Sequence, residues 1–165
     1  MEMEGFELPA SLISDADFHE FGEIIQLNTV EPKSINQGKC LRFNDLVNLD
    51  HDSDGRLGIS IFESRIRSIP HKFKLVERHP HGSQFFFPMD SEPFLVIVAP
   101  DHEGKPGRPK AFITKKYQGI NIYRGTWHGV LTPFQGSGRF LVIDWIGTKV
   151  NLEEYEYSNY WKVTI

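Results

Sequence analysis

The stretch FLVIVA, residues 94–99, is an uninterrupted apolar run that contains three β-branched residues. Such a run is typical of a strand that is buried on both faces. Further short segments, either alternating or continuously apolar, lie around it between turns rich in Gly, Pro and Asp: 58–66, 73–79, 111–114, 119–123 and 139–145. Many short strands at close spacing predict a sandwich or a barrel. We therefore expect a mainly β protein whose sheet is closed or nearly closed.

One helix is predicted, close to the N-terminus. Ser14 followed by Asp17 resembles a capping box with Asp in place of Glu. Phe18 and Phe21 then fall on neighbouring positions of one face, and Gly22 is expected to end the helix. The length of 165 residues and the absence of an internal repeat predict a single domain over residues 1–165.

Composition limits the class of function. A net charge of −4 and the lack of a Lys/Arg run argue against a nucleic-acid partner. No apolar run approaches the roughly 20 residues that span a bilayer, and the N-terminal MEMEGFELPA lacks a signal-peptide pattern. The single cysteine, Cys40, excludes an internal disulfide and fits a reducing compartment. We expect a cytoplasmic protein that acts on a small molecule, without a membrane partner.

Three histidines and a glutamine form a candidate metal site. The motif HPHGSQ places His79 and His81 one residue apart with Gln84 behind them, and His128 follows in a second motif, GINIYRGTWHG. In small jelly-roll barrels, an H-x-H pair, a carboxylate and a further His suit Ni, Mn, Fe or Zn. Here Gln84 replaces the carboxylate, and Pro80 interrupts the strand. The pattern leaves two interpretations open, a metal site or strand-end histidines held by hydrogen bonds.

Charged and aromatic residues beside these motifs favour a small anionic substrate. Glu77 is a candidate general base or metal ligand, or else a partner in an ion pair at the barrel mouth. Tyr123, Arg124 and Trp127 precede His128 and offer aromatic walls and a guanidinium, unless they form a turn that caps the barrel. The carboxylate of Asp144 in an apolar strand either pairs with an arginine or orients a histidine.

These residues together resemble a known family. The run ERHPHGSQFFFPMDSEPFLVIVA (77–99), then AFIT (111–114), GINIYRGTWHGVLTPF (119–134) and FLVIDW (140–145) resembles the ureidoglycolate lyases of allantoin and purine degradation, formerly called hydrolases. The upstream SINQGKCLRFNDL (34–46) resembles the family's Asn–Gly…Arg–aromatic–x–Asp segment. The resemblance runs from the leading helix to about residue 146 and leaves the C-terminal tail unmatched.

The resemblance implies a cupin-like double-stranded β-helix, a jelly-roll barrel that is usually a homodimer. The implied activity is that of a carbon–nitrogen lyase that cleaves (S)-ureidoglycolate to glyoxylate and urea, with a divalent metal, nickel. Family positions carried onto this chain are Glu77, Arg78, His79, Gly82, Ser83, Gln84, Trp127 and His128. His81 stands where the family often has an apolar residue, so it is not expected to be an essential ligand.

Elimination from ureidoglycolate requires a base for the hydroxyl proton, an acid for the leaving nitrogen and a cation for the carboxylate. We assign the catalytic roles to His79, His128 and Glu77, with the order of acid and base open. The metal set would be His79, Gln84 and His128. The predicted substrate-binding residues are Arg124 or Arg42 as carboxylate anchor, with Gln84, Ser83, Tyr123, Trp127 and Phe86.

Three other activities remain compatible with these residues. One is a different metal-dependent cupin enzyme, a dioxygenase or an isomerase acting on a small organic acid. Another is a binding protein that senses a sugar or an acid without turnover. The third is an amidohydrolase that releases ammonia from the same substrate and needs a water-activating metal.

Overall fold

The computed structural model describes residues 5–27 and 29–165. Residues 1–4, which belong to the acidic N-terminal stretch, and Asn28 lie outside that description. The described strands are β1 Phe6–Pro9, β2 Ser11–Leu12, β3 Gly22–Ile25, β4 Lys33–Ile35, β5 Cys40–Arg42, β6 Arg56–Glu63, β7 His71–Arg78, β8 Gln84–Pro88, β9 Leu95–Ala99, β10 Asp101–His102, β11 Lys105–Pro106, β12 Lys110–Ile113, β13 Gly119–Ile122, β14 Trp127–His128, β15 Arg139–Ile146 and β16 Glu153–Thr164. The helix α1 covers Asp15–Phe18.

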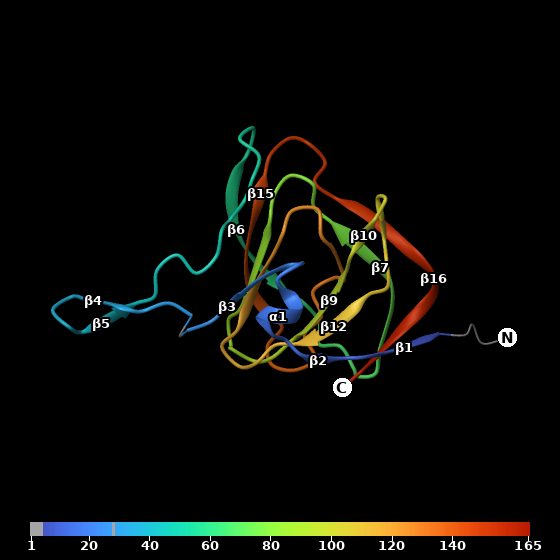
Figure 1. The fold of residues 1–165 in the computed structure, drawn as a ribbon, viewed down its shortest axis with the longest axis horizontal. Helices are drawn as coiled ribbons and strands as arrows, with labels where there is room; N and C mark the ends of the chain where they lie inside the picture. Colours follow the sequence, from blue (N-terminus) through green and yellow to red (C-terminus); the bar gives the residue numbers. More distant parts are fainter. Residues whose placement is uncertain (1–4, 28) are drawn as a thin grey trace.

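Two sheets face each other and form a nearly closed barrel (Figure 1). The larger has the order β1-β16-β7-β14-β9-β12-β2, and the smaller has the order β3-β13-β8-β15-β6. Neighbours are antiparallel except for β1 with β16 and β2 with β12. The hairpin β4–β5 extends away from the barrel, at the left of Figure 1. The predicted mainly β, cupin-type jelly-roll barrel is confirmed.

Strand β9 shows why the apolar run at its position is continuous. It lies between β14 and β12, and all five of its residues are buried. Val96 and Val98 face the core between the two sheets, whereas Leu95 and Ile97 join a second core with Trp161. Both faces of the strand are therefore covered by protein, which removes any selection for alternating polar residues.

The second core depends on the C-terminal tail, which the sequence left unassigned. The tail forms the long strand β16, which pairs with β7 on one side and with β1 on the other. Its register against β7 shifts between Glu156 and Trp161. Val163 is fully buried, and Tyr157 packs against the same cluster. The aromatic residues of the tail thus close the far side of the larger sheet.

The predicted helix is present but shorter than expected. Ser14 caps it as predicted, because its Oγ accepts a hydrogen bond from the Asp17 amide at 3.3 Å. Phe18 and Phe21 are both buried, but α1 ends at Phe18 and Gly22 already begins β3. A Cβ on Gly22 would approach the carbonyl oxygen of Asn121 to 2.3 Å, so Gly22 serves close pairing with β13. Within the described residues, no helix has the length and apolarity that crossing a membrane requires.

Candidate active site

Glu77, His79 and His128 come together inside the barrel. Each offers one ligand atom, and these three atoms lie within 4.8 Å of one another. His128 on β14 lies directly opposite Glu77 on β7 in an antiparallel pair, which places their side chains on the same face of the sheet. His79 follows the end of β7, with its Nε2 at 3.9 Å from Glu77 Oε1. We refer to these three residues as the triad.

Backbone carbonyls fix the tautomer of both histidines. His79 Nδ1 donates to the carbonyl of Asn151 at 2.7 Å, and His128 Nδ1 donates to that of Gly129 at 3.0 Å. Because a carbonyl can only accept, each neutral ring carries its lone pair on Nε2. Both Nε2 atoms are buried and have no hydrogen-bond partner. A buried polar atom without a partner is unusual in a native protein and indicates a site for a bound group.

The donor set of the triad fits a divalent cation. Two imidazole nitrogens and one carboxylate oxygen are ligands that Zn, Ni, Mn and Fe accept in proteins. The hydrogen bonds from Nδ1 to the carbonyls of Asn151 and Gly129 are of the kind that orients metal-binding histidines. The predicted ligands His79 and His128 are therefore joined here by Glu77.

Burial sets the charges of the triad. It lowers the pKa of His128 to about 3, and the neighbouring His79 contributes in the same direction. Burial also raises the pKa of Glu77 above its usual range; the charge of His79 opposes this, and Glu154 adds to it. His128 is consequently neutral at neutral pH, whereas Glu77 is a stronger base than an ordinary carboxylate.

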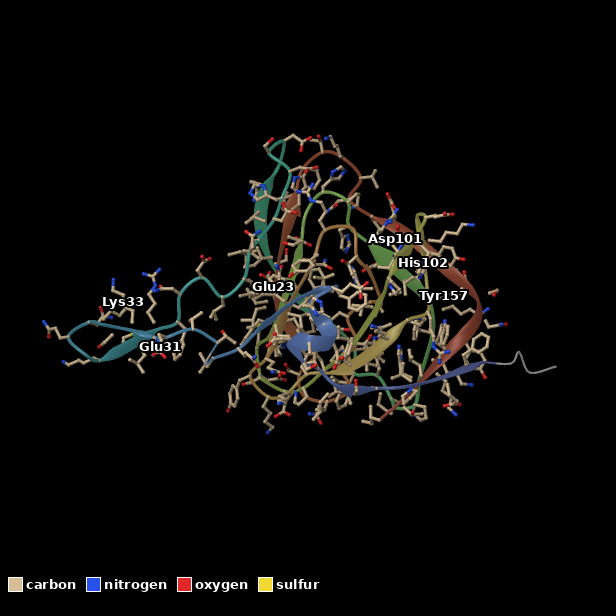
Figure 2. The ribbon with its side chains drawn as sticks, in the orientation of Figure 1. Glu23, Glu31, Lys33, Asp101, His102 and Tyr157 are labelled. Atoms are coloured by element: carbon tan, nitrogen blue, oxygen red, sulfur yellow. The ribbon has the colours of Figure 1, made fainter. Side chains whose placement is uncertain are left out.

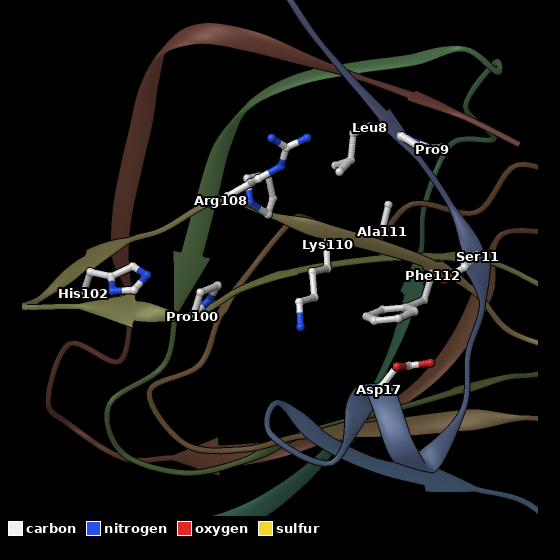
Figure 3. A pocket seen from close by; sticks show the side chains of 11 residues that line it. Leu8, Pro9, Ser11, Asp17, Pro100, His102, Arg108, Lys110, Ala111 and Phe112 are labelled. Carbon is white, nitrogen blue, oxygen red and sulfur yellow. The ribbon is translucent and has the colours of Figure 1, made fainter.

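Glu77 also lines a cavity of about 340 Å³. The lining consists of Phe62, Glu63, Ser64, Arg67, Glu77, Val130 and Leu131. This volume lies within the range of small-molecule sites. A cavity of about 600 Å³ lies elsewhere, beside β1 and β12, and is lined by His102, Arg108 and Lys110 among others (Figure 3). No triad residue lines that larger cavity, so we place the chemistry in the smaller one.

Gln84 provides a further buried acceptor at the start of β8. Its Nε2 donates to Asp144 Oδ2 at 3.2 Å, while its Oε1 is buried without a partner. The carboxylate of Asp144 therefore orients an amide, and not an arginine or a histidine as expected. The predicted roles of Gln84 in binding substrate or metal remain predictions.

The two arginines predicted to hold the substrate carboxylate lie outside the cavity. Arg124 donates from Nε and Nη2 to Asp50 at 2.7 and 3.0 Å and from Nη1 to Asp52. These carboxylates raise its pKa and engage three of its nitrogens. Arg42 lies opposite Lys33 on the hairpin β4–β5, which extends away from the barrel (Figure 2).

His81 is not one of the three triad residues, and the expectation that it is not an essential ligand stays a prediction. Strand β7 ends at Arg78, so Pro80 does interrupt the extended run between the two histidines. His81 Nδ1 bonds to Asp52 Oδ2 at 2.8 Å, and its ring lies 4.8 Å from that of Trp145. The H-x-H pair is thus divided between a buried site and a polar cluster.

Trp127 faces the side of the larger sheet opposite to His128. It packs with Val76 and Ala99 in a separate apolar cluster. Its Nε1 donates to Asp101 at 2.8 Å, and the Arg78 guanidinium lies 4.4 Å above its ring. Consecutive residues of a strand point to opposite faces, which explains why the adjacent Trp127 and His128 separate. Trp127 therefore does not form a wall of the site around the triad.

Three other predicted substrate-binding residues are absent from the lining of the Glu77 cavity. Ser83 Oγ accepts from the amide of Asp50 at 3.0 Å. Tyr123 lines a different cavity. Phe86 belongs to the core and packs edge-on against Phe62, which lines the Glu77 cavity. Of these three, Phe86 is linked to the cavity, through Phe62.

Sequence reasoning missed Arg67. This residue lines the cavity together with Glu77, and its Nε is buried without a hydrogen-bond partner. It lies in the segment ESRIRSIP, which carries no recognisable motif.

Known proteins place the chain in one family. The family model described as ureidoglycolate lyase matches residues 6–164. This chain belongs to the ureidoglycolate lyase family. The match confirms the resemblance found in the sequence, extends it through the tail that forms β16, and makes the chain a lyase.

Relatives in the ureidoglycolate lyase family cover most of this chain. The protein named ureidoglycolate lyase from Rhodobacter capsulatus is 50% identical over 138 residues, which are 84% of this chain and 86% of that protein. Ureidoglycolate lyase 2 from Rhizobium meliloti is 41% identical over 157 residues, 94% of this chain and 96% of that protein. The ureidoglycolate lyase from Brucella abortus is 38% identical over 144 residues, 87% and 85% respectively.

Proposed function

We propose that this chain cleaves (S)-ureidoglycolate to glyoxylate and urea in allantoin and purine degradation. The observation that carries the proposal is the triad, whose two unpartnered Nε2 atoms lie beside a carboxylate that opens onto a cavity of about 340 Å³. Membership of the ureidoglycolate lyase family supports the same substrate.

The reaction is balanced in protons. The hydroxyl oxygen of ureidoglycolate loses a proton and becomes the aldehyde oxygen of glyoxylate, and the carbon–nitrogen bond breaks. The departing ureido nitrogen takes up one proton and leaves as urea. No water is consumed, so one group that accepts the first proton and returns it to nitrogen meets the requirement.

Glu77 is the residue of the triad best suited to carry that proton. It lines the cavity, and its burial makes its carboxylate more basic. His128 is a weak base, because burial lowers its pKa to about 3. His79 lies beside that carboxylate, with its Nε2 at 3.9 Å from Glu77 Oε1.

The triad would also hold a divalent cation, for which the resemblance implies nickel. His79 and His128 would hold the cation through Nε2, and Glu77 would hold it through its carboxylate. When bound, the cation supplies positive charge that stabilises the developing oxyanion. The Nδ1 hydrogen bonds to backbone carbonyls hold both rings ready for this role.

Product analysis tests the proposal. The protein is incubated with (S)-ureidoglycolate, and glyoxylate, urea and ammonia are assayed in parallel, before and after treatment with EDTA and after addition of Ni²⁺, Mn²⁺ or Zn²⁺. We expect equal amounts of glyoxylate and urea without ammonia, and loss of turnover after EDTA that one of these cations restores. Release of ammonia in place of urea would identify a hydrolase, and absence of turnover under every condition would overturn the proposal.

A homodimer is a further proposal, supported by an exposed apolar surface. On the outer side of the five-stranded sheet, Ile59 and Ile61 of β6 are 72% and 62% exposed. The strand registers place Ile59 beside Ile143 and Ile61 beside Leu141. On the next strand, Ile143 lies beside Phe85 and Leu141 lies beside Phe87. We call these six residues the apolar sheet face. A contiguous surface of this kind is typical of a protein–protein interface, and one face used by both copies gives a two-fold dimer.

A cytoplasmic location and the absence of nucleic-acid and membrane partners complete the proposal. The exposed free thiol of Cys40 supports the location, because such a thiol persists in a reducing compartment. The net charge of −4 supports a role without nucleic acid.

A further inference from the structure

The substrate proposed above carries a carboxylate, and the cavity needs a cation to recognise it. Arg124 is held by Asp50 and Asp52, and Arg42 lies on the extended hairpin β4–β5. Neither lines the cavity next to Glu77. The residue that does so is Arg67, the one basic side chain in its lining.

Arg67 has a fixed backbone and a guanidinium without an ionic partner. Its amide donates to the carbonyl of Pro133 at 2.8 Å, which anchors the residue beside the loop that follows His128. Within residues 5–27 and 29–165, no carboxylate lies within salt-bridge distance of its side chain. Its Nε is buried and makes no hydrogen bond.

The charge of Arg67 also affects its surroundings. Burial lowers the pKa of His71, and the positive charge of Arg67 lowers it further. His71 therefore brings no neutralising charge to the guanidinium. An arginine that is partly buried, unpaired and exposed to a cavity is a ready binding site for an oxyanion, because its planar nitrogens match a carboxylate in two parallel hydrogen bonds.

We propose that Arg67 binds the carboxylate of the substrate in the cavity that Glu77 lines. Arg67 thereby selects α-hydroxy or α-oxo acids over neutral ureido compounds and orients the reacting carbon toward Glu77. The inference rests on the proposed function and adds the group that recognises the acid.

Glu63 and Ser64 do not compete for this role. The Glu63 carboxylate, also in the lining, accepts from Arg139 Nε at 2.7 Å and so does not neutralise Arg67. Ser64 Oγ donates to the carbonyl of Leu131 at 3.2 Å. Glu63 and Ser64 are therefore occupied, and the guanidinium of Arg67 is the cationic group of the lining that can take an anion.

Binding and turnover are measured separately to test the inference. Isothermal titration calorimetry on EDTA-treated protein compares oxamate with oxamide, which has the same shape but no carboxylate. The variants are Arg67→Gln, Arg67→Lys and the matched control Arg65→Gln, which removes an exposed arginine two residues away. We expect Arg67→Gln to bind oxamate about 10- to 100-fold more weakly than the wild type and to lose the preference over oxamide. Arg67→Lys retains part of the affinity, and Arg65→Gln retains all of it.

Steady-state kinetics provide the second readout. For Arg67→Gln we expect a raised KM for ureidoglycolate and an unchanged rate with hydroxymethylurea, which lacks the carboxylate. Equal oxamate affinity in Arg67→Gln and wild type, or no oxamate binding by the wild type, would overturn the inference. If the wild type binds oxamate through Arg67 but does not cleave ureidoglycolate, the anion site stands and the proposed substrate fails. Thermal unfolding of each variant verifies that the fold is intact.

Discussion

Two buried imidazole nitrogens without partners distinguish the triad from the rest of the interior. The chain fixes the tautomers of His79 and His128 with the carbonyls of Asn151 and Gly129, and not with carboxylates. Because a carbonyl oxygen can only accept a hydrogen bond, each neutral ring carries its lone pair on Nε2. Glu77 is the carboxylic acid of the triad, and the following prediction concerns its proton.

Glu77→Gln should lower kcat for ureidoglycolate about 10²- to 10⁴-fold, because the amide keeps the shape of the side chain but cannot carry a proton. In the wild type, kcat/KM should fall as the pH drops through the raised pKa of Glu77, since the base form is lost. Glu154→Gln is the control: activity remains, and the acidic limb moves to lower pH, because Glu154 contributes to raising that pKa. Full activity in Glu77→Gln would exclude Glu77 as the proton carrier.

His128 should make the metal-free protein less stable in mild acid. Its pKa is about 3 in the folded state, compared with 6.5 as the reference value. Below pH 6.5 the unfolded chain takes up a proton that the folded chain refuses, so the free energy of unfolding decreases as the pH falls, by about 1.4 kcal/mol per unit for this group. Urea unfolding in EDTA at pH 7 and pH 5.5 measures the slope. His128→Gln should flatten it, and an unchanged slope in that variant would contradict the assignment.

At this scale the sequence predicted the residues of the triad but not their surroundings. Glu77, His79 and His128 stand in short motifs, where residue type and spacing carry information. Arg124 also stands in a motif, yet its partner Asp50 lies 74 positions away, and no local pattern indicates that pair. Arg67 acquires its place only from the fold.

Strand pairing brings residues from separate sequence motifs together in one site. The register of β14 places Trp127 opposite Ala99 and His128 opposite Val98, so that Trp127 joins the apolar cluster of Ala99 and Val76 while His128 lies on the other face of the sheet. Alternation predicted such faces for single strands, and the strands β6, β7, β9, β12, β13 and β15 were found where the sequence placed them. Strand β16 was missed. Its glutamates lie on an exposed face and its aromatic residues on a covered face, and these two faces exist only because β1 and β7 flank the strand in the folded sheet.

Val98→Ala tests whether the site depends on the packing of β9. Val98 is fully buried and lies directly opposite His128. Removing its two methyl groups should lower the free energy of unfolding by about 2 kcal/mol, from lost burial and the cavity left behind. For the control Val150→Ala, at a residue that is 80% exposed, the change in the free energy of unfolding should be within the error of the urea titration. Equal stability of the two variants would contradict the assignment of β9 to the centre of the core.

At the scale of the whole molecule, the two sheets bury one face each in the common core but are covered differently outside. In the larger sheet, apolar residues of β9 and β12 pack against residues of β16 and β1, and together they form the second core. The five-stranded sheet has no such cover among the described residues, and Ile59 and Ile61 remain exposed. The alternation of apolar and polar residues in β6 predicted two different faces. The sequence alone does not show which face is covered by other segments of the chain.

Ile61→Glu should therefore convert the proposed homodimer to a monomer. The substitution places two like charges in the apolar sheet face, one from each copy, where a two-fold interface offers no compensating cation. Because Ile61 is 62% exposed in the single chain, the fold should survive, which circular dichroism and thermal unfolding verify. Sedimentation velocity should report a mass near 38 kDa, twice the 19.0 kDa of the chain, for the wild type and near 19.0 kDa for the variant. Leu27→Glu, at a residue that is 57% exposed outside this face, should remain dimeric. A monomeric wild type, or a variant that stays dimeric, would show that the apolar sheet face is not the interface.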